Sequence, residues 1–200
     1  MSSSSSSANA DPASRRLANL VGAWALALAD RLEAATTAAA GRGGRGPAAL
    51  VALHEFAGGE TIDDLSHVLG LTHSAAVRLV DALVDDGHVV RRYRAGDRRS
   101  VALALTPSGR AAARRVIRAR ARAVETTLDG LSEAQRRSLT TLAERLTGDV
   151  AALRLEERRQ GATPSGGWLC RLCDFDACGR AEGRCPAARR AATLGSTSRA

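Results

Sequence analysis

The segment Thr61–Thr106, TIDDLSHVLGLTHSAAVRLVDALVDDGHVVRRYRAGDRRSVALALT, predicts two short helices followed by a hairpin. Thr61 and Thr72 are residue types that cap helix N-termini, and Gly70 and Gly87 suit the left-handed geometry that ends helices. After Gly87 the pattern becomes extended, with a polar AGDRR turn between VVRRYR and the alternating SVALAL. The segment therefore predicts a helix-turn-helix followed by an arginine-rich wing, an arrangement typical of DNA binding.

The second of these two helices has one apolar face and one polar face. Its apolar side chains recur at three- and four-residue spacing, so they are expected to pack on the core. The residues expected to project outward are Thr72, His73, Ser74, Val77, Arg78 and Asp81. Hydroxyls near a helix start suit phosphate oxygens, and an arginine can form two hydrogen bonds to a guanine. Arg78 is therefore the predicted base-reading residue, and Val77 can pack on a thymine methyl group.

The composition favours a polyanionic partner and excludes several other classes. The 29 basic side chains are all arginine and leave a net charge of +8 against 21 acids. GC-rich coding is the alternative explanation for the absence of lysine. There is no apolar run of eighteen residues and no export signal at the N-terminus, which predicts a cytoplasmic protein without membrane contact. Motifs of nucleophilic or phosphate-transfer enzymes are absent, so no catalytic residue is predicted.

Further helices flank the central segment. Residues 1–10 are a serine-rich stretch that is expected to be disordered. Helices are predicted from Pro12 to about Ala40, over 47–56, from Pro107 to about Leu128, and from the Ser132 capping box to about Glu157. The first and last of these carry long apolar stripes, Leu17 to Leu32 and Leu139 to Leu153. Such stripes either pack against a second copy of the chain or pack within it.

The wing and its flanks resemble the MarR family of winged-helix transcriptional regulators. The motifs that carry the resemblance are Leu71-Thr72, Gly87, Arg91-Arg92, Asp97 with Arg99, and Leu105-Thr106 with Gly109. The resemblance covers roughly residues 13–158. It implies a mainly α fold with a small β-hairpin wing and long terminal dimerisation helices, in which residues 11–160 form the dimer domain and 47–106 its DNA-binding core.

The resemblance also implies partners and roles for individual residues. A homodimer is expected to place each recognition helix in a major groove and each wing near a minor groove of a pseudo-palindromic double-stranded DNA operator. In the wing, Arg94, Arg98 and Arg99 are predicted DNA contacts, and Asp97 is expected to orient one of these arginines. A solvated charged turn is the alternative. A small-molecule effector is a further expected partner.

The C-terminal segment predicts a metal site. Residues 161–167 are a Pro- and Gly-containing linker, and residues 168–200 form what we call the cysteine tail. This tail contains every cysteine of the chain, Cys170, Cys173, Cys178 and Cys185, in a polar segment that is expected to have no core of its own. Four thiolates at this spacing suit tetrahedral zinc. An iron–sulfur cluster is the alternative, since Cys185 precedes Pro186 as a cluster ligand does in bacterial ferredoxins, and redox-active thiols are a third.

Together these features predict a homodimeric, sequence-specific DNA-binding regulator, a repressor, with a structural or sensory metal site. The chain is not expected to be an enzyme. The alternative is an interaction protein, either an architectural DNA binder without sequence preference or an adaptor that docks through its cysteine tail. Preference for one palindrome over random DNA distinguishes the two.

Overall fold

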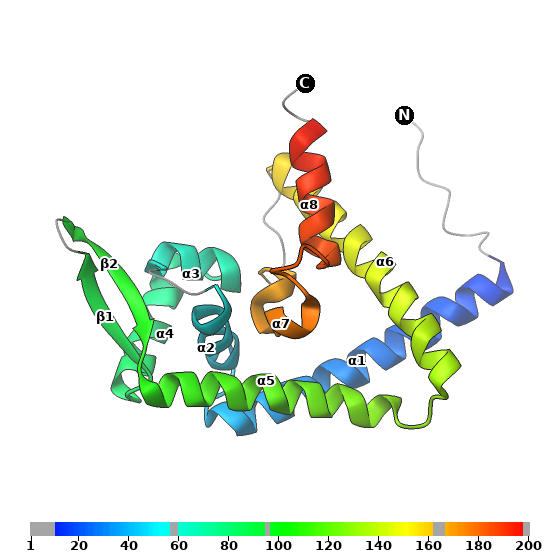
Figure 1. Cartoon of the computed structure of the whole chain (residues 1–200), viewed down its shortest axis with the longest axis horizontal. Coiled ribbons are helices and arrows are strands. Elements are labelled where there is room, and N and C mark those ends of the chain that lie inside the picture. Colours follow the sequence, from blue (N-terminus) through cyan, green and yellow to red (C-terminus); the bar gives the residue numbers. More distant parts are fainter. Residues whose placement is uncertain (1–10, 57–59, 95–96, 162–166, 198–200) are drawn as a thin grey trace.

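The helix-turn-helix and its wing form in the order that the sequence predicts (Figure 1). The computed structural model describes residues 11–56, 60–94, 97–161 and 167–197. Helix α2 spans Gly46–Glu55, α3 spans Ile62–Leu69 and α4 spans His73–Asp85. Strands β1 (Val89–Arg94) and β2 (Asp97–Leu105) then pair antiparallel. The predicted fold class, mainly α with a two-stranded wing, is confirmed.

The helix ends are set by the residues that the sequence singles out. The Thr61 hydroxyl accepts the Asp64 N–H, and the Asp64 carboxylate accepts the Thr61 N–H, which completes a capping box. The Thr72 hydroxyl caps α4 in the same way by accepting the Ala75 N–H at 3.3 Å. Gly70 ends α3 in the left-handed region at φ 64°. The turn between α3 and α4 is therefore fixed by local hydrogen bonds at both of its ends.

Long helices frame this unit. Helix α1 (Pro12–Ala40) packs along α5 (Pro107–Leu128), and α6 (Glu133–Arg159) turns away from the end of α5 (Figure 1). Thr106 caps α5, and Ser132 with Gln135 forms the predicted capping box of α6. The predicted bounds of α5 are confirmed, whereas α2 begins one residue before Pro47 and ends one before Phe56. The α1 start is also confirmed, although Asp11 makes no side-chain capping bond.

One core lies under the helix-turn-helix and extends to α5. Its largest fully buried side chains are Leu50, Val51, Leu65, Leu69, Val80, Leu83, Val89 and Val116. These come from α2, α3, α4, β1 and α5, so the recognition helix and the base of the wing are held by the same packed cluster. Among the described residues, no helix is both long and apolar enough to span a membrane.

The cysteine tail differs from the expected coreless segment. It forms a 3-10 turn η1 (Leu169–Leu172), a short helix α7 (Phe175–Cys178) and helix α8 (Pro186–Thr197). Trp168 and Leu172 pack against the main core, and α8 packs on α6. Figure 1 shows α7 between α2 and α6. The prediction of a tail without a core was wrong because it rested on the polar composition of the tail and did not consider that its few aromatic residues could pack against the rest of the chain. The expected disordered residues 1–10, and residues 162–166 of the linker, lie outside the described residues.

Candidate nucleic-acid interface

Helix α4 presents one face to the core and the other to solvent. Ala76, Val80 and Leu83 are fully buried. Of the residues predicted to face outward, Thr72, His73, Ser74, Arg78 and Asp81 are exposed, and Val77 is half-buried. Within the described residues, the Arg78 guanidinium has no hydrogen-bond or ion-pair partner. An exposed arginine at mid-helix with its donors uncommitted has the chemistry that base reading requires.

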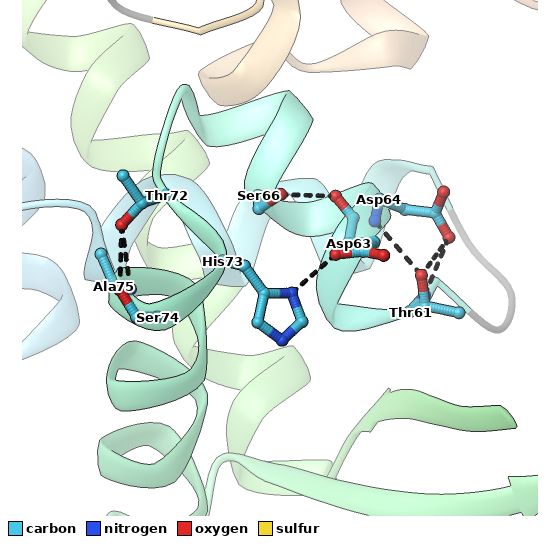
Figure 2. Close-up of polar contacts among 8 residues, drawn as sticks. All are labelled: Thr61, Asp63, Asp64, Ser66, Thr72, His73, Ser74 and Ala75. Carbon is cyan, nitrogen blue, oxygen red and sulfur yellow. Dashed lines mark hydrogen bonds and ion pairs between the residues drawn. The ribbon is translucent and has the colours of Figure 1, made fainter. Parts of the chain in front are cut away.

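The turn before α4 is tied to α3 by side chains (Figure 2). His73 Nδ1 lies 2.7 Å from Asp63 Oδ1, which joins the first turn of α4 to the first turn of α3. The Ser66 hydroxyl donates to the Asp63 carbonyl oxygen at 2.8 Å. His73 lies on the predicted DNA-facing side, and its contact with Asp63 was not predicted. Because both side chains are exposed, this pair adds little stability.

An ion pair joins α4 to the hairpin. Arg91 Nη2 lies 2.6 Å from Asp81 Oδ1. Asp81 therefore faces outward as predicted, but it holds the arginine of β1 at a fixed place beside α4. This pair was missed, because nothing in the sequence shows which of the neighbouring arginines Asp81 would meet. An acid on a DNA-facing surface repels phosphate unless it is paired, so Arg91 makes the surface compatible with a polyanion.

The predicted DNA contacts of the hairpin lie at the far end of its two strands, where Arg94 of β1 pairs with Asp97 of β2. Val89 pairs with Leu105, Arg91 with Leu103, and Tyr93 with Val101, before an irregularity between Tyr93 and Arg94. For Arg94, Asp97, Arg98 and Arg99 the structure describes the backbone but not the side chains. Their predicted roles in DNA binding stay predictions.

The base of the wing is closed around Gly109 of α5. The Thr106 N–H donates to the His88 carbonyl oxygen at 3.0 Å, and the Thr106 hydroxyl donates to the Gly87 carbonyl oxygen at 2.7 Å. A Cβ atom on Gly109 would lie 2.0 Å from that His88 oxygen. Only glycine therefore allows α5 to approach the start of β1 this closely, which gives a physical reason for the Thr106-x-x-Gly109 motif.

Two helices expose apolar faces away from the hairpin. The exposed residues are Leu17, Leu20, Val21, Trp24 and Leu26 on α1, and Leu142, Leu146, Val150 and Leu153 on α6. Side chains of this size are expected to be covered when they form a contiguous patch. These exposed residues form most of the stripes that the sequence indicated, whereas Leu28, Leu32 and Leu139 of those stripes are half-buried by packing within the chain.

The cysteine tail brings its thiols into two pairs. All four cysteines are free thiols, and Cys185 is buried. Cys170 donates a hydrogen bond to Cys173, which lowers the pKa of Cys173 to about 6 and raises the pKa of Cys170. Burial, together with a hydrogen bond to Cys185, raises the pKa of Cys178 to about 11. Across the described residues, no three His, Cys, Asp or Glu side chains gather into a preformed metal site.

The fold, the exposed face of α4 and the paired hairpin define a winged-helix protein. The family model described as the MarR family matches residues 46–100, from α2 into the wing. Over these residues the chain is similar to the MarR family of DNA-binding transcriptional regulators. The matched segment does not include the cysteine tail.

Solved structures show the same fold. YusO from Bacillus subtilis is 18% identical with a TM-score of 0.61, and the match covers 69% of this chain and 96% of that one. A MarR family protein from Bacillus stearothermophilus is 26% identical with a TM-score of 0.56, over 70% and 99%. A point mutant of S. aureus MepR, bound to an oligodeoxyribonucleotide, is 16% identical with a TM-score of 0.54, over 67% and 97%. None of the curated proteins compared matches the chain.

Proposed function

We propose that the chain is a homodimeric repressor that binds a pseudo-palindromic operator with α4 and the wing, and that acts in the cytoplasm. The observation that carries this proposal is the face of α4 opposite the buried Ala76, Val80 and Leu83, where Arg78 is exposed and uncommitted. The MepR structure bound to an oligodeoxyribonucleotide supports DNA as the partner. A ligand, metal or redox event is proposed to tune the affinity for the operator.

A second copy of the chain is the proposed occupant of the open faces of α1 and α6. Their exposed leucines and Trp24 are among the largest apolar side chains at the surface. Each fully buried leucine contributes about 2 kcal/mol, so a few such contacts per protomer support a stable dimer. Two-fold symmetry would then place the two α4 helices roughly 34–36 Å apart, one turn of DNA.

Selection of an operator from random double-stranded DNA, followed by competition, tests this function. We expect the selected site to be an inverted repeat that binds at least about a thousandfold more tightly than random DNA. An architectural binder would give no enriched sequence, and an adaptor would give no DNA binding, so either result would overturn the proposal.

The Arg78→Ala variant tests which residue reads the base. We expect a loss of about 1–3 kcal/mol on the operator and a relaxed preference at one position in each half-site. Arg118→Ala is the matched control, because it removes the same charge from an exposed position of α5. Equal losses on operator and random DNA would limit Arg78 to a phosphate contact.

A further inference from the structure

The cysteine tail is clamped between the helix-turn-helix and α6. The Trp168 N–H donates to the Val68 carbonyl oxygen at the end of α3, at 2.8 Å. Gly167 has a φ of 75°, and a Cβ there would lie 2.5 Å from the Val68 oxygen, so the backbone of the tail lies directly on that of α3. From the other side, Arg154 of α6 donates to the Gly167 carbonyl oxygen at 2.7 Å. One dipeptide therefore contacts both α3 and α6.

An aromatic cluster holds the first half of the tail on α2. The Phe56 ring meets Trp168 edge-on at 5.4 Å and Phe175 edge-on at 4.9 Å. The Arg180 guanidinium lies 4.5 Å from the centre of the Phe175 ring, and the Phe175 N–H donates to Glu55 at 3.0 Å. Edge-on pairs of this kind stabilise beyond the area they bury. The cluster fixes the segment that contains Cys170 and Cys173.

The second half of the tail is held by a different element. Helix α8 packs on α6, and Arg159 of α6 donates to the Leu194 carbonyl oxygen at 2.8 Å. Cys185 is buried immediately before α8. Cys170, Cys173 and Cys178 thus lie in the segment that contacts α2, whereas Cys185 lies at the start of the helix that packs on α6.

The four cysteine sulfurs of the tail determine which kind of metal ion it can bind. Cys170, Cys173 and Cys178 lie in the first half of the tail and Cys185 lies in the second, and the Cys-x2-Cys spacing lets two sulfurs meet one ion. Four thiolates in a tetrahedron are selective for zinc among the common divalent ions. Arg120 and Arg180 lie near Cys173 and favour its thiolate form, but a divalent cation neutralises the accumulated negative charge of four thiolates directly.

We propose that Cys170, Cys173, Cys178 and Cys185 bind one zinc ion, and that binding draws the two thiol pairs together and thereby secures α3 through Trp168. Binding forms four zinc–sulfur bonds and releases the thiol protons to solvent. Since the described part of the chain holds no preformed site, closing one joins the Cys170–Cys173 pair to Cys178 and Cys185, and so fastens the segment held by α2 to the start of α8, which packs on α6. The ion thus adds a link between these elements at the point where Gly167 and Trp168 touch α3. The effect on DNA affinity rests on the proposed function, whereas the zinc site does not.

Metal analysis of the full chain, purified without oxygen under reducing conditions, tests the site. We expect one zinc per chain, loss of the zinc on chelation, and recovery with one equivalent added back. Cobalt in its place should show the absorption of a tetrahedral tetrathiolate. The variant with all four cysteines replaced by serine should bind none. Brown protein that contains iron and sulfide, or reduced thiols without bound metal, or unchanged zinc in the serine variant, would each overturn the assignment.

Operator binding before and after chelation tests the coupling. We expect the zinc-loaded chain to bind the selected operator at least about fivefold more tightly than the stripped chain, and zinc to restore that affinity. The serine variant should not respond to chelator, which controls for other effects of the reagent. Phe56→Leu keeps every thiol but weakens the aromatic cluster, so it should bind one zinc with a smaller response. Unchanged or tighter operator binding after zinc loss would overturn the coupling.

If the serine variant does not fold, the native chain alone still tests both proposals, because zinc can be removed and added back without any substitution. The two proposals fail separately. If the chain selects an operator but takes up no zinc, the metal site alone is overturned. If the chain takes up zinc but selects no operator, the proposed function alone is overturned.

Discussion

Replacement of Gly109 by alanine should open the base of the wing. The new Cβ would lie 2.0 Å from the His88 carbonyl oxygen and 2.9 Å from its carbon. Since comfortable contact is about 3.5 Å, one backbone must retreat by more than an ångström. That movement breaks the bond of 3.0 Å from the Thr106 N–H to the same oxygen.

The magnitude follows from three terms. Overpacking costs about 1–3 kcal/mol, with the upper part expected because both groups are backbone. The lost hydrogen bond costs about 1 kcal/mol more. Alanine returns about 1 kcal/mol as the better helix former. We therefore expect the Gly109→Ala variant to lose about 2–3 kcal/mol of unfolding free energy.

Gly148→Ala is the matched control, because Gly148 also lies inside a helix but has open space. Its Cβ would meet nothing closer than the Pro186 oxygen at 3.8 Å. This variant should gain up to about 1 kcal/mol. Urea unfolding followed by circular dichroism, at one protein concentration, measures both variants. If the two unfolding free energies shift in the same direction, the close approach of α5 to β1 is not what requires glycine at position 109.

Three further predictions concern other parts of the molecule. Arg98→Ala or Arg99→Ala should flatten the salt dependence of DNA binding by about 0.9 in log–log slope per phosphate contact, measured by titration at several salt concentrations; an unchanged slope contradicts contact with the wing. Leu146→Asp should shift sedimentation from dimer toward monomer, whereas Arg118→Asp on α5 should not. Burial raises the pKa of Glu55 above its ordinary value of 4.5. The unfolding free energy should therefore fall as the pH rises from 4.5 through the pKa of the folded state, because Glu55 ionises more readily in the unfolded chain. Glu55→Gln keeps the acceptor for the Phe175 N–H, so its unfolding free energy should match the native value in acid and exceed it near neutral pH; a constant difference would exclude the linkage.

The elements of the winged helix could be predicted because their signals are local. Thr61, Thr72 and Thr106 each cap the helix that follows them by bonding a backbone N–H within three residues. Such contacts depend on the chain's own neighbours and not on distant packing. The outward face of α4 follows from periodicity for the same reason, since one helical face had to be buried.

The contacts that tie elements together could not be predicted in this way. Asp63 pairs with His73, and Asp81 pairs with Arg91, in a chain that offers 29 arginines and four histidines, so charge alone could not select the partners. The docking of the tail did leave a signal. The chain has only two Phe and two Trp, and both Phe side chains join Trp168 in one cluster. Aromatic side chains placed in a polar tail of so aromatic-poor a chain indicate a docking surface.

Helix α3 is the element through which these contacts meet. At its start, the Leu103 N–H of β2 donates to the Glu60 carbonyl oxygen at 2.8 Å, and Asp63 pairs with His73 of α4; at its end, Val68 accepts the bond from the tail. A shift of α3 by an ångström would therefore reach α4. Base contacts need donor–acceptor distances of about 2.7–3.2 Å, whereas attraction to phosphate falls off over a Debye length of about 8 Å. A change at the cysteine tail should consequently lower affinity for the operator more than affinity for random DNA. The measurement is the ratio of operator affinity to random-DNA affinity, with and without zinc, and we expect this ratio to fall when zinc is removed. Equal losses of affinity on both DNAs would contradict transmission through α3.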